Sequence, residues 1–141
     1  MKHLFSVLVV TALCLGSVGV SGASSEISDA VRKTLQANFK ATQSEDIEGI
    51  MATMHSNSPN RAATQAQLPM LFQQYDLKYE LKDYQFVSLS GEYAIARVKQ
   101  HTSKLSGPDF RNNTLDSFMI FRQENDQWKL WAQTILDIEF E

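Results

Sequence analysis

The sequence predicts an α+β domain in which three amphipathic helices precede an antiparallel sheet of about four long strands. Apolar residues recur at helical spacing from about residue 27 to residue 75, and from residue 77 onward they mostly alternate with polar ones. Turn-forming dipeptides separate the alternating segments. The 141 residues are 43% hydrophobic and 21% charged, which indicates one folded domain and excludes a disordered chain.

Residues 1–23 have the pattern of a secretory signal peptide. Lys2 gives a positive start, residues 4–15 form an apolar run, and Ser21-Gly22-Ala23 offers small residues for cleavage after Ala23. The run is too short for a helix across a bilayer of about 30 Å. A membrane anchor or a lipoprotein signal at Cys14 are the alternatives, and the bulky Leu13 argues against the second. We therefore expect export, periplasmic or secreted, with residues 24–141 as the domain and no membrane partner for the mature form.

Several function classes are excluded by composition. Cys14 is the single cysteine and would leave with the signal, which excludes a thiol nucleophile, a Cys zinc site and an iron–sulfur cluster from the mature domain. The net charge is −3, so the chain has no excess of basic residues that would bind nucleic acid, and we expect no nucleic-acid partner. His55 and His101 lack metal-ligand spacing, so we expect no metal and no cofactor.

Three helical stripes are visible. The first helix, capped by Ser24 or Ser25, carries a stripe of Ile27, Ala30, Val31, Leu35 and Phe39. Ser44 is the expected cap of the second helix, whose apolar face consists of Ile47, Ile50, Met51 and Met54. The third has Leu68, Leu71, Phe72 and Tyr75. Because proline costs about 3 kcal/mol inside a helix, Pro69 predicts that this helix starts near Leu68 or kinks there.

Four strands follow. The apolar parity changes from Leu81 to Tyr84, which predicts a bulge near Asp83 in the first strand. A Ser90-Gly91 turn leads to a strand over residues 92–105, and a loop over residues 106–112 leads to a strand over residues 113–124. Asn125-Asp126 then forms a tight turn before the last strand, residues 127–140.

The last turn predicts a pairing register. A two-residue turn places Phe121 opposite Leu130, with the further pairs Met119–Ala132, Leu115–Leu136 and, on the other face, Ile120–Trp131. Both faces of this hairpin are then largely apolar, although helices can cover only one of them. The other face needs a partner subunit or a ligand cavity, and we expect a homodimer through the sheet.

Four segments resemble the nuclear transport factor 2-like (NTF2-like) superfamily, and within it small SnoaL-like bacterial proteins. They are residues 75–81 (YDLKYEL), residues 91–94 (GEYA), residues 107–113 (GPDFRNN) and residues 128–130 (WKL). The resemblance covers residues 24–141. It implies a cone-shaped curved sheet wrapped round the helices, with a pocket at its open end and frequent dimerisation. Members include isomerase-, cyclase-, dehydratase- and epoxide hydrolase-like enzymes as well as proteins that only bind, so the fold does not decide the function.

Enzymes of this superfamily use buried polar side chains, and two such candidates stand on apolar faces here. His101 and Asp116 would form an acid–base dyad if the loop paired them opposite each other. Otherwise Asp116 lies at the sheet rim and His101 in solvent. The candidate pocket residues are His55, Tyr75, Tyr79 and Arg97. Arg97 is expected opposite Tyr84, where it stacks on the ring or binds an anionic ligand.

Three functions are therefore compared. The first is binding of a small, largely apolar molecule without a demonstrated reaction. The second is an isomerase-, cyclase- or dehydratase-type enzyme that uses Asp116 with His101 or a tyrosine. The third is a protein–protein interaction module on the outer face of the sheet.

Overall fold

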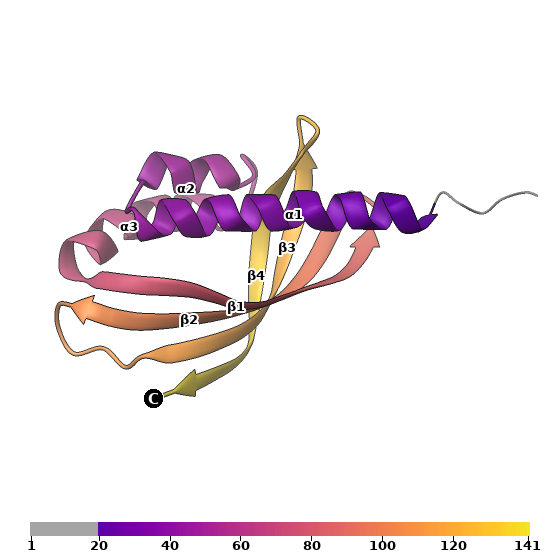
Figure 1. Cartoon of the computed structure of the whole chain (residues 1–141). Helices are drawn as coiled ribbons and strands as arrows, with labels where there is room; N and C mark the ends of the chain where they lie inside the picture. Colours follow the sequence, from indigo (N-terminus) through magenta and orange to yellow (C-terminus); the bar gives the residue numbers. More distant parts are fainter. Residues whose placement is uncertain (1–19) are drawn as a thin grey trace, which may run out of the picture.

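Three helices cover the concave side of one curved sheet in the computed structural model, which describes residues 20–141 (Figure 1). The helices are α1 (Val20–Gln43), α2 (Ile47–Thr53) and α3 (Arg61–Gln74). The strands are β1 (Asp76–Ser90), β2 (Tyr93–Ser106), β3 (Asn113–Glu124) and β4 (Gln127–Phe140), paired antiparallel in the order β1-β2-β3-β4. The predicted α+β architecture is confirmed.

The signal-peptide prediction falls largely on residues 1–19, which lie outside the described residues. The expected cleavage bond after Ala23 lies in the first turn of α1, because this helix begins at Val20 rather than at Ser24 or Ser25. No helix within the described part of the chain is both long and apolar enough to cross a membrane.

The starts of the other two helices also differ from prediction. The Asp46 carboxylate caps α2 by accepting from the Gly49 N–H at 2.9 Å, whereas the Ser44 hydroxyl donates back to the Lys40 carbonyl at the end of α1. Helix α3 begins at Arg61, so Pro69 lies inside it. Residues 61–67 are mostly strong helix formers that face solvent. The apolar stripe therefore marks only the packed part of α3.

β1 contains the predicted bulge and two further register shifts, one of them at its start between Asp76 and Leu77. Leu81 pairs with Gln100 and Asp83 with Lys99, so the bulge near Asp83 is confirmed. The hairpin turn consists of Gly91 and Glu92 rather than Ser90 and Gly91, because Ser90 pairs with Tyr93. With this turn and a further shift between Phe86 and Ser88, Arg97 lies opposite Gln85, so its predicted pairing with Tyr84 is wrong. The guanidinium over the Tyr84 ring belongs instead to Arg32 of α1, 4.7 Å from the ring centre.

The β3–β4 hairpin begins as predicted and then changes register. Asn125 and Asp126 both have positive φ, and Phe121 pairs with Leu130. Register shifts at Trp131 and Leu136 then overturn the other predicted pairs, which are replaced by Ile120–Ala132, Met119–Gln133 and Leu115–Ile138. Alternation could not reveal these bulges because both faces of β4 carry apolar residues. Their consequence is that Gln133 shares the concave face with Met119.

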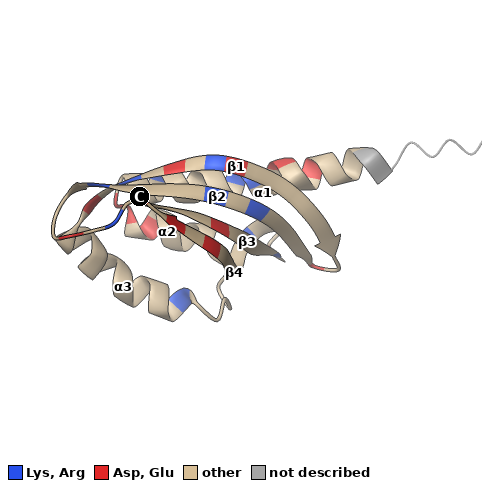
Figure 2. Ribbon diagram, turned by 90° about the horizontal axis from the view of Figure 1, so that it is seen from below, with Lys and Arg blue, Asp and Glu red and all other residues tan. Residues whose placement is uncertain are grey.

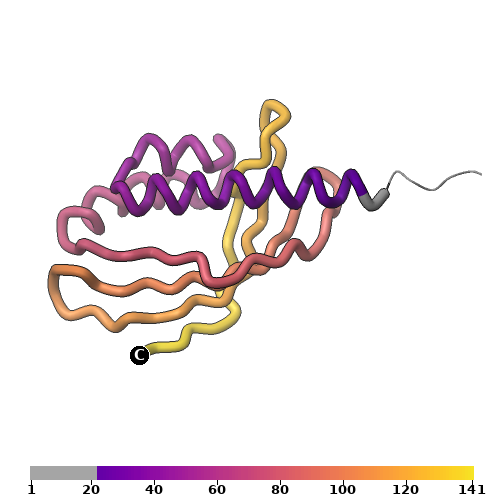
Figure 3. Tube along the Cα trace, in the orientation of Figure 1, coloured from indigo at the N-terminus to yellow at the C-terminus, as the bar shows by residue number. Residues whose placement is uncertain are grey.

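The main core lies between α1 and the concave face of the sheet, and consists of Val31, Leu35, Ala94, Ala96, Val98, Met119, Phe121 and Trp128. A second cluster joins the end of α1 to α2 and α3, and consists of Ala41, Ile50, Met51, Met54 and Leu68. The sheet bends sharply across its middle (Figure 3), so the β3–β4 hairpin rises beside α1 while the end of β4 turns away from the helices. The bend opens a space between the two clusters.

Candidate functional site

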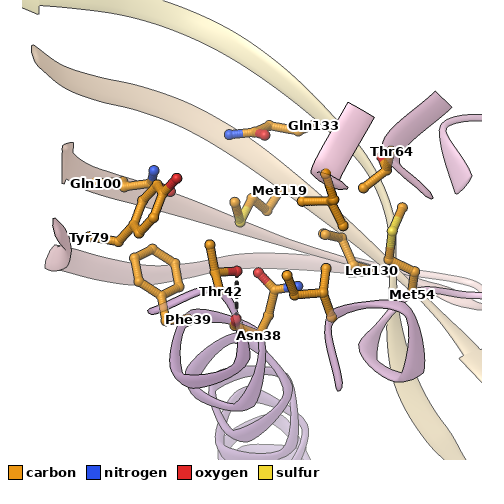
Figure 4. A pocket seen from close by; sticks show the side chains of 12 residues that line it. Asn38, Phe39, Thr42, Met54, Thr64, Tyr79, Gln100, Met119, Leu130 and Gln133 are labelled. Carbon is orange, nitrogen blue, oxygen red and sulfur yellow. Dashed lines mark hydrogen bonds between the residues drawn. The ribbon is translucent and has the colours of Figure 1, made fainter. Parts of the chain in front are cut away.

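A pocket of about 220 Å³ occupies that space, between the C-terminal half of α1, helices α2 and α3, and the concave face of the sheet (Figure 4). Its apolar wall consists of Phe39, Ile50, Met54, Leu68, Met119 and Leu130. Its polar groups belong to Asn38, Thr42, Thr64, Tyr79, Gln100 and Gln133. All three helices and all four strands contribute, so the pocket exists only in the assembled fold.

Internal hydrogen bonds hold the three pocket amides in place. Their NH2 groups donate to neighbouring hydroxyls: Asn38 to Thr53 at 2.8 Å, Gln100 to Thr102 at 3.1 Å and Gln133 to Ser117 at 3.0 Å. Among the described residues, no hydrogen bond engages the side-chain carbonyl oxygens of these amides. The pocket thus offers fixed acceptors for a ligand hydroxyl or N–H.

Tyr79 supplies the matching donor. Burial, together with the nearby Glu45 carboxylate, raises the pKa of Tyr79 above its ordinary value of 10.0, so the phenol keeps its proton at neutral pH. Its backbone is held by Gln43 at the end of α1, whose side chain accepts from the Tyr79 N–H at 2.8 Å and donates to the Leu77 carbonyl at 3.2 Å.

None of the twelve lining side chains is a carboxylate, imidazole, amine, guanidine or thiol. A general base near neutral pH is therefore missing from the wall itself. The arrangement is suited to holding a neutral molecule by apolar contact and a few hydrogen bonds.

His101 and Asp116 do not form the predicted dyad. Asp116 pairs with Lys99, and His101 pairs with Thr114, because the loop over residues 107–112 sets the register two residues away from the required one. Both side chains lie on the outer face, opposite the face of the buried Val98 and Met119. Figure 2 looks onto this outer side and shows residues of both charges on β1, basic residues on β2 and acidic ones on β3 and β4.

Each member of the expected dyad has another partner. The Asp116 carboxylate is held by the Arg97 guanidinium through two hydrogen bonds, of 2.9 and 2.6 Å, and lies 3.8 Å from the Lys99 ammonium. The His101 ring contacts the Thr114 hydroxyl at 3.2 Å, and its other nitrogen lies 3.8 Å from the Glu141 carboxylate. These contacts are structural and lie away from the pocket.

The Asp116 ion pair predicts an acid sensitivity. Hydrogen bonding from Arg97, with its positive charge, lowers the pKa of Asp116 below its ordinary value of 3.8. A carboxyl group whose pKa is lower in the folded than in the unfolded chain stabilises the fold above the unfolded pKa, and this contribution disappears as the pH falls through the folded value. As the pH is lowered below about 4, we expect the urea concentration at the unfolding midpoint to fall less steeply for Asp116→Asn than for the wild type. Asp109→Asn, in an exposed loop, is the control; identical slopes for the wild type and D116N would contradict the expectation.

Among the four predicted pocket residues, Tyr79 lines the pocket. His55 is buried where the segment after α2 meets the hairpin, with its Nδ1 accepting from the Asn57 N–H and its ring 5.0 Å from that of Trp131. Tyr75 ends α3 and packs 5.9 Å from the Phe110 ring, and Arg97 lies on the outer face.

Sequence reasoning missed the amide groups because it searched for ionisable side chains. A signal exists for one of them. Every second residue of β2 faces the core, as Ala94, Ala96 and Val98 do. Gln100 is the next residue in this series, so it is a polar side chain at a position where an apolar one is expected. Gln133 has no such signal, because the bulge at Trp131 places it on the concave face.

Comparison with solved structures gives the fold. A protein of Novosphingobium aromaticivorans provisionally assigned as an aromatic ring hydroxylase superposes with a TM-score of 0.67 at 16% identity, over 82% of this chain and 94% of that one. A provisionally assigned dehydratase of the NTF2-like family from Streptomyces avermitilis gives 0.64 at 17% identity, over 77% and 94%. An NTF2-like protein of unknown function from Pseudomonas putida gives 0.61 at 16% identity, over 82% and 86%. At such identities the likeness establishes the fold alone, and the expected NTF2-like fold is confirmed.

Comparison with curated proteins finds no match. A family model does match residues 33–140, from the middle of α1 to the end of β4, and is described as "Anti-sigma-I factor RsgI9, C-terminal domain". With the helices, the bent four-stranded sheet and the pocket in place, the chain belongs to this family of anti-sigma-I factor RsgI9 C-terminal domains and has the NTF2-like fold.

Proposed function

We propose that this domain binds a small, neutral, largely apolar molecule in the pocket beside α1 and does not transform it. The observation that carries the proposal is the pocket wall, which combines apolar side chains with fixed amide acceptors and one protonated phenol. Burying an ionised ligand there would leave its charge uncompensated, which is costly. A neutral hydroxyl or carbonyl compound would find partners for its polar atoms.

The size of the pocket limits the ligand. An engineered apolar cavity of about 150 Å³ suffices for benzene, and the pocket here has about 220 Å³. One ring with a short substituent, or a branched chain of similar bulk, would occupy it. A hydroxyl on that substituent would donate to Gln100 or Gln133, and a carbonyl would accept from Tyr79.

The enzymatic alternative has less support. An isomerase, cyclase or dehydratase needs a group that moves a proton beside the bound substrate. Asp116 and His101 lie on the opposite face of the sheet, and the raised pKa of Tyr79 disfavours the phenolate base.

Export and self-association belong to the same proposal. The residue pattern over residues 1–23 supports delivery to the periplasm or the exterior. Half-buried Ile95, Phe118 and Ile120 on the outer face support pairing with a second copy. Sedimentation at increasing concentration separates such a dimer from a module that keeps this face for another protein.

Benzyl alcohol and benzoate test the binding proposal, because they share a ring and differ in charge. With 13C-labelled methionine methyl groups, Met54 and Met119 report on the pocket, and Met70, which is 63% exposed, serves as the internal control. We expect benzyl alcohol to shift the two pocket methyl signals saturably and to leave Met70 unchanged. Benzoate should bind at least about tenfold more weakly because its charge would be desolvated.

A pair of variants refines the test. Gln133→Leu removes a pocket acceptor and should weaken benzyl alcohol binding by up to about fivefold, the size expected for one hydrogen bond. Gln127→Leu changes an exposed glutamine at the start of the same strand and should have no effect. Equal binding of alcohol and benzoate, or shifts that never saturate, would rule the proposal out.

A further inference from the structure

Half of β4 leaves one edge of the sheet open. Within residues 20–141, β4 is an edge strand that pairs only with β3. The segment after α2 covers the first residues of β4 along the edge that faces away from β3. There the His55 N–H donates to the Leu130 carbonyl at 2.9 Å, and the Ser58 hydroxyl donates to the Trp131 carbonyl at 2.7 Å. Beyond Trp131, no described segment continues this cover.

The uncovered part, residues 133–140, is apolar on the concave side. Ile135, Ile138 and Phe140 pair with β3 residues of the concave row and remain 51%, 40% and 52% exposed. The Ile138 N–H donates to the Asp137 carboxylate at 2.9 Å rather than to a neighbouring strand. A sheet edge that no strand covers and that carries large exposed apolar side chains is what an added strand can bind.

The other side of the same strand is acidic. Asp137 and Glu139 pair with outer-face residues of β3, and Glu141 follows directly after the strand. Figure 2 shows acidic residues on β4. The edge therefore has apolar side chains on one face and carboxylates on the other. Cross-strand neighbours of opposite charge are favourable, and like charges are unfavourable.

We propose that residues 133–140 of β4 bind an extended segment of another protein in which apolar residues alternate with lysine or arginine. The segment extends the sheet by one strand. Its apolar side chains cover the flanks of Ile135, Ile138 and Phe140, and its basic side chains lie beside Asp137 and Glu139. This site borders the pocket, with which it shares Gln133, and does not depend on the binding of a small ligand.

Charge argues against a second copy at this edge. Antiparallel pairing of two β4 strands would bring the two acidic faces side by side, with Asp137 and Glu139 of each copy close together. A basic, amphipathic strand meets the same edge without that repulsion. Pairing of two copies through the outer face of the sheet uses a different surface.

Two capped octapeptides provide the probe: one alternates lysine with valine, the other glutamate with valine. Each is titrated into the full-length chain, with amide exchange and NMR shifts followed along the backbone. We expect the lysine peptide to protect the amides of residues 133–140 and to bind at least about tenfold more tightly than the glutamate peptide. Equal affinities, no binding, or protection at β1 in place of β4 would overturn the proposal.

Variants locate the contact. Ile138→Lys, at a partly exposed position, should weaken the lysine peptide about tenfold, whereas Leu105→Lys, at an exposed apolar residue of β2, should not. The double change Asp137→Asn with Glu139→Gln should leave the fold intact and remove most of the preference for lysine over glutamate. If I138K instead converts a dimer to a monomer in sedimentation, the edge belongs to a second copy and the proposal is wrong.

Discussion

Replacing Phe121 by alanine is expected to lower the free energy of unfolding by about 3–5 kcal/mol. The Phe121 side chain is fully buried in the cluster between α1 and the sheet, where its neighbours include Val31, Leu35 and Trp128. Truncation leaves a cavity, because tightly packed neighbours relax only partially around a deleted ring. Urea unfolding followed by Trp fluorescence and circular dichroism measures the loss.

Phe140→Ala is the matched control for this change. Phe140 lies on the neighbouring strand but is 52% exposed, and its main partner is the Arg111 guanidinium, 4.5 Å from the ring centre. Losing that contact should cost no more than about 1 kcal/mol. Similar losses for the two phenylalanines would show that the core is not where the structure places it.

Gly107→Ala should destabilise the fold by about 3 kcal/mol, the upper end of the range for a strained backbone. Gly107 has a φ of +117°, a conformation that residues with a Cβ rarely adopt. An added Cβ would also lie 2.5 Å from the Gln74 carbonyl oxygen and 3.1 Å from the Tyr75 ring. The loop between β2 and β3 would have to move away from the end of α3.

Gly91→Ala separates the backbone effect from the clash. Gly91 also has a positive φ, +59°, but a Cβ there meets no atom within 4 Å. Its replacement should cost about 1 kcal/mol, the penalty for a left-handed residue alone. Thermal and urea unfolding of both variants give the comparison, and an equal loss would contradict the close contact at Gly107.

Where turn chemistry and alternation agree, the sequence was a sufficient guide. Asn125-Asp126 tolerates positive φ, so the bounds of β3 and β4 and the Phe121–Leu130 pair follow from it. The bulge near Asp83 was visible because the apolar parity changes there. At Trp131 and Leu136 both faces are apolar, and the same kind of bulge leaves no trace in the pattern.

The pocket was harder to predict than the fold. The search for catalytic chemistry selected His101 and Asp116, whose directions depend on a register that an irregular loop sets. The residues that do line the pocket with polar atoms are neutral amides and hydroxyls, which in a sequence resemble ordinary surface residues.

Local patterning by itself determined that helices precede an antiparallel meander, because hydrophobic period and turn propensity act over a few residues. Only the tertiary structure decided which polar side chains share a cavity and which are paired on the far side of the sheet. A one-residue bulge reverses the direction of every side chain after it, and its position depends on contacts between segments far apart in the chain.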